Sequence, residues 1–264
     1  MYFTDHLQRR IFLPNPPERI ISLVPSQTEL LVDLGLEDKI VGVTKFCVHP
    51  NHLRKTKTIV GGTKSYRFEV IDTLKPDLII GNKEENDREG IERLTEKYPV
   101  WLSDIYDLKD SFRMISDLGL MTNTSSKAES LIKQLEEPFA EPAPKMGTCL
   151  YLIWENPCLV AGKNTFIDSM LALAGFENLM QLDRYPEIDE KKLIELSPDF
   201  LFLSSEPFPF KEKHELAFQK LLPKTQTLRV DGELFSWYGS RLLQSALYFR
   251  RLRAKIDSNP SFRS

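Results

Sequence analysis

The chain has 264 residues, 41% of them hydrophobic, and its 35 lysines and arginines nearly balance 38 aspartates and glutamates. This is ample apolar material for a packed core in one large domain or two small ones. A net charge of −3, with basic residues dispersed among acidic ones, argues against a nucleic-acid-binding surface. No run approaches the roughly 20 apolar residues of a membrane span, and three cysteines are too few for a disulfide framework.

The first ten residues are polar and contain no apolar core of signal-peptide length. We therefore expect the chain as written to be cytoplasmic, and to be periplasmic or surface-anchored if the true start lies upstream.

The N-terminal part of the chain predicts an extended leader followed by a strand and a helix. Residues 1–18 contain three prolines that forbid a helix and favour polyproline or edge-strand geometry. The apolar run 20–24 predicts a buried strand. Ser26 then stands as the expected N-cap of a helix, with Glu29 completing a capping box and Gly35 ending the helix.

Short strands and helices alternate through the rest of the chain. Further strands are expected at 40–44, 78–80, 100–102, 148–154, 159–161, 200–203 and 227–230. Further helices are expected at 68–74, 87–96, 108–118, 125–137, 165–174, 190–196, 213–222 and 240–256.

One local pattern occurs in both halves of the chain. Residues 74–80 and 196–202 each lead from a helix end through Pro-Asp into an apolar strand. This recurrence predicts an α/β fold of two lobes with mainly parallel sheets, joined by a single long backbone helix, with a ligand cleft between the lobes. The expected parts are a leader at 1–18, an N-terminal lobe at 19–120, a bridging helix at 121–141 and a C-terminal lobe at 142–264.

Several enzyme signatures are absent. The sequence has no phosphate loop ending in Gly-Lys-Ser/Thr, no Gly-x-Gly-x-x-Gly, no His-Glu-x-x-His and no Gly-x-Ser-x-Gly. These absences lower the odds of an enzyme and predict no catalytic residues.

Cys47, His49 and His52 lie on one predicted loop and have the residue types of a transition-metal site. Structural zinc usually requires four ligands with paired Cys-x-x-Cys spacing, which is missing here. His49 is therefore a candidate metal ligand, with a position facing the cleft or on a solvated loop as the alternatives.

Acidic side chains follow one buried strand directly. Glu84 and Glu85 come after the strand at 78–80, at the carboxyl end where ligands approach parallel sheets. They could bind an amide-rich or cationic ligand, whereas a solvated acidic loop at the start of the next helix would explain them equally well.

Aromatic residues in the second half form a further candidate ligand surface. Trp237 and Tyr238 precede the last predicted helix and Arg241 lies at its start, where a ligand platform and packing into the core are both consistent with the pattern. Trp154 and Tyr185 also follow strands or open helices. Together these side chains would line a cleft suited to a flat macrocycle or chelate.

Four segments are shared with a known family. They are Pro-x-Arg-Ile-Ile-Ser-Leu-x-Pro-Ser-x-Thr-Glu at 17–29, Val-Gly-Val at 41–43, Glu-x-Ile-x-x-Leu-x-Pro-Asp-Leu-Ile at 69–79 and Ser-Pro-Asp at 197–199. Over almost its whole length the chain resembles the class III substrate-binding proteins of ABC importers, the cobalamin and iron-siderophore receptors also called helical backbone metal receptors. It looks closest to the cobalamin branch, in a group with Phe-Cys-Val-His-Pro at 46–50, Asn-Lys-Glu-Glu-Asn at 82–86 and Ser-Trp-Tyr-Gly-Ser-Arg at 236–241.

The resemblance implies a two-lobed monomer in which residues 125–137 form the rigid backbone helix. Receptors of this family dock on a permease through one glutamate per lobe; Glu69 matches the first position, and the second holds Lys191, beside Glu190. The resemblance and the cleft argument together give the expected ligand contacts. They are Phe46, His49, Glu84, Glu85, Trp154, Tyr185, Trp237, Tyr238 and Arg241.

We therefore expect non-enzymatic binding of a metal-containing chelate as the substrate-binding component of an ABC-type importer. Cobalamin or another corrinoid is the first candidate and an iron–siderophore or haem-like chelate the second, with no intrinsic cofactor. The alternative is a cytosolic metal- or cofactor-handling protein or enzyme that reuses the fold without a permease.

Overall fold

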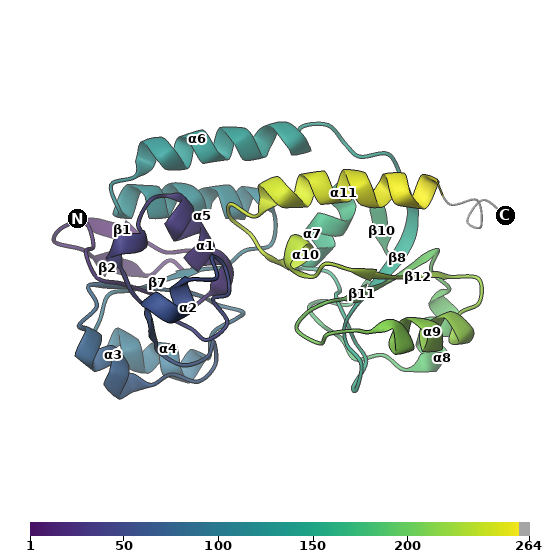
Figure 1. Cartoon of the computed structure of the whole chain (residues 1–264), viewed down its shortest axis with the longest axis horizontal. Coiled ribbons are helices and arrows are strands. Elements are labelled where there is room, and N and C mark those ends of the chain that lie inside the picture. Colours follow the sequence, from purple (N-terminus) through teal and green to yellow (C-terminus); the bar gives the residue numbers. More distant parts are fainter. Residues whose placement is uncertain (259–264) are drawn as a thin grey trace. The chain divides into compact units, whose positions relative to one another are not determined.

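The computed structural model describes residues 1–258, which form two compact units (Figure 1). The N-terminal unit contains residues 1–135 together with Tyr238–Arg241, which we call the return segment. The C-terminal unit contains residues 136–237 and continues from Leu242. The chain therefore leaves the N-terminal unit after Leu135, re-enters it for the return segment and leaves it again.

The N-terminal unit is built on a five-stranded, all-parallel sheet in the order β5-β4-β3-β6-β7. An antiparallel hairpin of β1 (Tyr2–Thr4) and β2 (Arg10–Phe12) precedes it. The sheet strands are β3 (Ile20–Ser22), β4 (Ile40–Val43), β5 (Thr58–Ile59), β6 (Leu78–Asn82) and β7 (Val100–Ser103). The helices are α1 (Pro25–Asp33), η1 (Glu37–Lys39), α2 (Leu53–Thr56), α3 (Phe68–Leu74), α4 (Arg88–Thr95), α5 (Leu108–Met121) and α6 (Ser125–Glu136).

The C-terminal unit has a second five-stranded sheet, in which β10, β8, β11 and β12 are parallel neighbours and β9 pairs antiparallel with β8. Its strands are β8 (Gly147–Trp154), β9 (Leu159–Val160), β10 (Phe176–Asn178), β11 (Phe200–Ser204) and β12 (Gln226–Val230). Its helices are η2 (Glu137–Phe139), α7 (Phe166–Leu173), α8 (Glu190–Leu196), α9 (Glu212–Leu221), α10 (Glu233–Ser236) and α11 (Leu242–Asp257). No helix within residues 1–258 combines the length and apolar character needed to cross a membrane.

Both units confirm the predicted α/β class with mainly parallel sheets, and each has its own apolar core. Strands β5 and β10 are absent from the prediction because neither contains an apolar run: β5 is Thr-Ile and β10 is Phe-Glu-Asn. The last helix begins at Leu242 rather than at residue 240. The preceding loop, predicted as irregular, contains the short helix α10.

The repeated Pro-Asp pattern has the same structural role in both units. Helices α3 and α8 each span seven residues, and each ends at a residue with positive φ, Lys75 (45°) and Ser197 (43°). The Asp77 carboxylate then accepts the backbone N–H groups of Glu18 and Arg19 at 2.7 and 2.8 Å, just before β3. Asp199 likewise accepts the N–H of Thr148 in β8 at 2.7 Å. Each aspartate therefore ties the start of a neighbouring strand.

The predicted capping box at the start of α1 is wrong. Val24 is the N-cap residue, Pro25 occupies the first turn, and no side chain caps the helix. Proline is favoured at the first helical position because it lacks an N–H and its φ is already helical. Ser26 is consequently inside the helix, with its hydroxyl buried and without a hydrogen-bond partner among the described residues.

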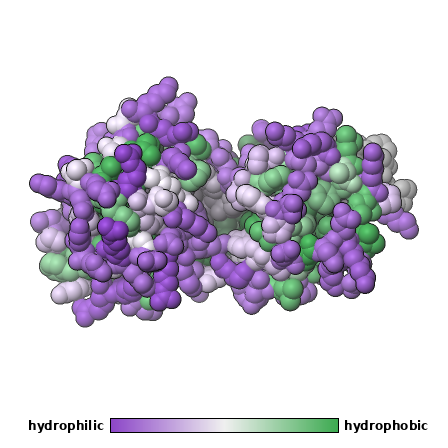
Figure 2. All heavy atoms as spheres, turned by 90° about the horizontal axis from the view of Figure 1, so that it is seen from below, coloured by the Kyte–Doolittle hydropathy of each residue, from purple (hydrophilic) through white to green (hydrophobic). Residues whose placement is uncertain are grey.

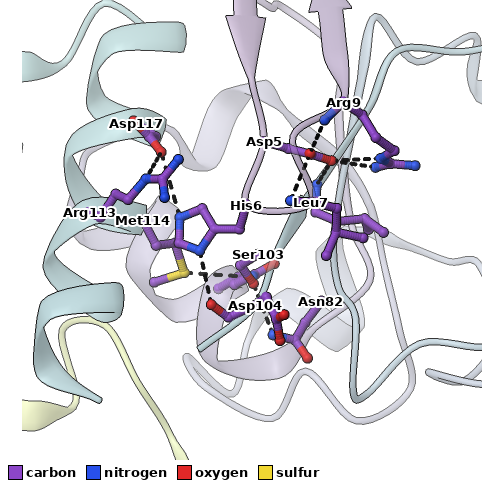
Figure 3. A network of polar contacts seen from close by, with 12 residues as sticks. Asp5, His6, Leu7, Arg9, Asn82, Ser103, Asp104, Arg113, Met114 and Asp117 are labelled. Atoms are coloured by element: carbon purple, nitrogen blue, oxygen red, sulfur yellow. Dashed lines mark hydrogen bonds and ion pairs between the residues drawn. The ribbon is translucent and has the colours of Figure 1, made fainter. Parts of the chain in front are cut away.

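The leader is folded into the β1-β2 hairpin and is held by polar contacts (Figure 3). Asp5 is fully buried and accepts the backbone N–H groups of Leu7 and Arg9 at 2.9 Å each. His6 Nδ1 lies 3.0 Å from the carbonyl oxygen of Asp104, while its Nε2 lies 3.6 Å from Asp117 Oδ2. These contacts fasten the leader to the N-terminal unit.

The return segment is fixed by a buried ion pair. Arg241 donates from Nε and Nη2 to the two carboxylate oxygens of Glu29 in α1, at 2.8 and 2.7 Å, and only 8% and 13% of the two side chains are exposed. Gly239, with φ of +98°, donates its N–H to Ser111 Oγ at 3.2 Å. A β-carbon at Gly239 would lie 3.4 Å from that of Leu30, and the positive φ would strain any residue that carried one.

We expect Arg241→Ala to lower the free energy of unfolding by about 3 to 5 kcal/mol, because it leaves the Glu29 carboxylate buried without its partner. Chemical denaturation of the full chain measures this. The control is Arg88→Ala, which removes an exposed i,i+4 pair with Glu92 and should change stability little. Equal losses in the two variants would contradict the role of the buried pair.

We expect Asp77→Ala and Asp199→Ala each to lower the free energy of unfolding by about 1 to 2 kcal/mol, since each removes a charged acceptor from backbone N–H groups at a strand start. Asparagine at either position retains one acceptor oxygen and should cost less. Denaturation curves of the four variants test the shared role, and an alanine variant as stable as the parent chain would refute it at that position.

Candidate functional site

The loop after β6 carries Glu84 and Glu85 and is held by two asparagines. Asn82 Oδ1 accepts the backbone N–H groups of Glu84 at 2.8 Å and Glu85 at 3.1 Å. Asn86 Oδ1 accepts the Asn82 N–H at 2.8 Å, and its amide donates to the Thr63 carbonyl at 2.9 Å. Asparagine side chains commonly define turns through such bonds to the backbone. The loop that presents the two carboxylates is therefore preorganised.

A side chain of the adjacent strand β7 and the space left by a glycine also support this loop. Asn82 donates from Nδ2 to Ser103 Oγ in β7 at 3.0 Å, a contact drawn in Figure 3. A β-carbon at Gly81 would lie 2.6 Å from Asn86 Oδ1, so the close approach of Asn86 requires glycine. Sequence reasoning missed the two asparagines as supports. The available signal was their position on either side of Glu-Glu, directly after a glycine at the strand end.

Glu85 is engaged by a side chain from the return segment. The Tyr238 hydroxyl donates to Glu85 Oε1 at 3.1 Å, and Tyr238 is 5% exposed. Burial, reinforced by the negative charge of Glu85, raises the pKa of Tyr238 well above its ordinary value. The phenol therefore keeps its proton at neutral pH and acts as a donor. Tyr238 thus positions one carboxylate of the acidic loop.

Trp237 has a comparable contact within the C-terminal unit. Its indole Nε1 donates to Glu206 Oε1 at 3.0 Å, and the Ser236 hydroxyl donates to the same oxygen at 2.8 Å. Burial raises the pKa of Glu206, and these two hydrogen bonds oppose the rise. The structure therefore buries all three residues of the predicted platform, Trp237, Tyr238 and Arg241, and pairs each of them with a glutamate.

The structure does not bring the three residues of the predicted metal loop together. Cys47 is fully buried, with Sγ 3.0 Å from Thr28 Oγ1, and burial raises the pKa of its thiol. His52 Nε2 instead lies 2.7 Å from Glu37 Oε1, and His49 is half-buried. Within residues 1–258, no group of three or more His, Cys, Asp or Glu side chains is placed to hold a metal ion.

Two of the predicted aromatic contacts remain accessible. Phe46 in the N-terminal unit is 48% exposed, with Lys45 Nζ 4.9 Å from its ring centre. Trp154 in the C-terminal unit is 38% exposed, and its ring centre lies 5.5 Å from that of Phe208. Tyr185 is half-buried. Phe46 and Trp154 therefore keep part of their ring surface open to solvent.

The predicted docking residues lie in the first turns of two helices of equal length. Glu69 is exposed in the first turn of α3, and Glu190 is the first residue of α8. Since α3 and α8 have the same length and each ends at a residue with positive φ, the residue of α8 that corresponds to Glu69 is Lys191, which is also exposed. Equivalent surface positions thus carry opposite charges.

Comparison with known proteins gives consistent matches. An uncharacterised ABC transporter substrate-binding lipoprotein of Bacillus subtilis is 23% identical over 209 residues, 74% of this chain and just under two thirds (66%) of that relative. A vitamin B12-binding protein of Vibrio parahaemolyticus is 28% identical over 198 residues, 72% of this chain and 71% of the relative. The crystal structure of a periplasmic haem-binding protein from Pseudomonas aeruginosa aligns with a TM-score of 0.75 and 25% identity, over 89% of this chain and 92% of that one.

The family model described as periplasmic binding protein matches residues 20–229, which include the main sheets of both units. Members of this family are binding proteins rather than enzymes, in agreement with the missing catalytic signatures. The chain belongs to the periplasmic binding protein family.

Proposed function

We propose that the protein binds a metal-containing chelate as the substrate-binding component of an ABC importer. Cobalamin or another corrinoid is the first candidate, and haem or an iron–siderophore the second. The carrying observation is membership of the periplasmic binding protein family, combined with relatives named for binding vitamin B12 and haem. Both ligands are flat macrocycles around a metal. The names of the relatives, lipoprotein and periplasmic, also support a place of action outside the cytoplasmic membrane.

Exposed ring surface and preorganised carboxylates are the features that suit such a ligand. We assign Phe46 and Trp154 to apolar contact with the macrocycle, since aromatic side chains gain most from covering flat apolar surface. Glu84 and Glu85 would accept hydrogen bonds from amide or hydroxyl groups at its edge. His49 and Tyr185, both half-buried, remain proposed contacts. Trp237, Tyr238 and Arg241 are assigned to holding the site rather than to touching the ligand.

Removal of an exposed ring should weaken ligand binding measurably. We expect Phe46→Ala and Trp154→Ala each to reduce affinity for the bound chelate about tenfold, which corresponds to about 1.4 kcal/mol of lost contact. Absorbance titration with cyanocobalamin, cobinamide, haemin and a ferric siderophore identifies the ligand, and calorimetry then measures the loss in each variant.

Phe12→Ala is the matched control, because Phe12 is a similarly exposed phenylalanine (52%) on the leader hairpin. Its affinity should equal that of the parent chain. Binding of none of the four chelates would overturn the proposed class. Equal losses in Phe12→Ala and Phe46→Ala would overturn the assignment of Phe46.

The importer role requires a permease, and Glu69 is the proposed contact in the N-terminal unit, with Glu190 in the C-terminal unit. A glutamate that docks on a permease meets positively charged groups there, and a lysine at the same position would be repelled by them. Glu69→Lys should therefore abolish ligand uptake while chelate affinity stays unchanged. Lys191→Glu, at the corresponding position of α8, should not reduce uptake. Uptake measured in cells and affinity measured on purified protein separate the two effects. Normal uptake by Glu69→Lys would contradict docking through α3.

A further inference from the structure

The C-terminal unit contains a pocket of about 770 Å³ between the segment that follows β10 and the helix α8. Its walls include Met180 and Ile188, which are 3% and 9% exposed and belong to the core of the unit. Leu179 and Leu196 also line the pocket and pack against the same core. Four apolar residues of the lining therefore belong to the core of the unit or pack against it.

Apolar surface continues to the mouth of the pocket. Leu182 lines it and is 62% exposed, so an apolar side chain lies open to solvent at the mouth. Figure 2 is viewed from the side on which Figure 1 places α8 and α9; it shows apolar side chains gathered on the C-terminal unit, whereas the N-terminal unit is mainly hydrophilic there. Covering this apolar surface with a ligand would remove it from water and so lower the free energy.

The charged side chains at the pocket entrance make the entrance negatively charged. Glu187 and Asp189 line it, and both are exposed. The lining also includes Lys192, but its ammonium group pairs with Glu195 Oε1 at 2.9 Å. Asp189 Oδ1 accepts the backbone N–H of Lys192 at 2.7 Å, which fixes the carboxylate at the start of α8. The two carboxylates therefore dominate the local charge.

We infer that this pocket binds a small amphiphile with an apolar body and a protonated amine head. The volume lies in the range of small-molecule sites, which combine apolar walls with a few placed polar groups. A cationic head would meet Glu187 and Asp189 and form charge-assisted hydrogen bonds, whereas an anionic head would be repelled. The pocket uses none of the residues assigned to the chelate, so either proposal can fail without the other.

The test compares three ligands of equal chain length on the full-length protein, n-octylamine, n-octanol and n-octanoate, by calorimetry near pH 7. We expect the octylammonium ion to bind several-fold more tightly than octanol, and octanoate to bind most weakly. Added salt should reduce the difference because it screens the exposed carboxylates. Absence of octylammonium binding, or affinity no greater than that of octanoate, would overturn the proposal.

Two variants separate the apolar and ionic contributions. Glu187→Gln should weaken octylammonium several-fold and leave octanol unchanged, while Leu182→Ser should weaken both alike. The matched control is Glu177→Gln, since Glu177 is an exposed carboxylate on β10 in the same unit and outside the pocket lining. Octylammonium affinity that is insensitive to Glu187→Gln, or equally sensitive to Glu177→Gln, would overturn the assignment of the head-group site.

Discussion

The ion pair between Glu29 and Arg241 is the contact on which the arrangement of the N-terminal unit depends most. Arg241 donates from Nε and Nη2 to both carboxylate oxygens of Glu29, and the pair is largely withdrawn from water. A buried charge without its partner is strongly unfavourable, so helix α1 and the return segment must be in place together. Through this pair the chain re-enters a unit that it had left after Leu135.

The segment that this pair anchors also contacts the acidic loop. With Arg241 fixed, Tyr238 reaches Glu85 and Gly239 reaches Ser111. Trp237, the preceding residue, belongs to the C-terminal unit and donates to Glu206 within that unit. A motif rich in aromatic and cationic residues thus serves to organise carboxylates. Its side chains shape the candidate site indirectly, through the groups they hold.

The two units share one local arrangement, an aspartate after a short helix that binds the start of a strand, but differ in the groups that follow it. Asp77 and Asp199 perform the same task after helices of the same length, which is strong structural support for an internal repeat. Directly after the equivalent strands the chemistry differs. Asn82 builds an acidic turn in one unit, whereas Ser204 in the other bonds to the backbone of Glu206. The scaffold is repeated, whereas the polar contacts at the ends of the two strands are not.

Several features of this protein were determined by the sequence alone. Apolar runs, Pro-Asp stops and the glycine after α1 are local signals, because each acts through the backbone conformation of its own few residues. They sufficed for the parallel α/β class and the internal repeat. Local errors occurred where neighbouring signals competed, as when Pro25 took the start of α1 and Ser26 was moved inside the helix.

Only the tertiary structure decided which side chains bind one another. Arg241 and Glu29 are 212 positions apart in the chain, and Tyr238 and Glu85 are 153 apart. No local pattern encodes such a meeting, because it follows from how strands and helices pack around a core. The same packing buried the Cys47 thiol against Thr28, apart from the two histidines of the predicted metal loop, and left Phe46 and Trp154 exposed. Residue types indicated the kinds of chemistry available, and burial decided which of these side chains remain exposed.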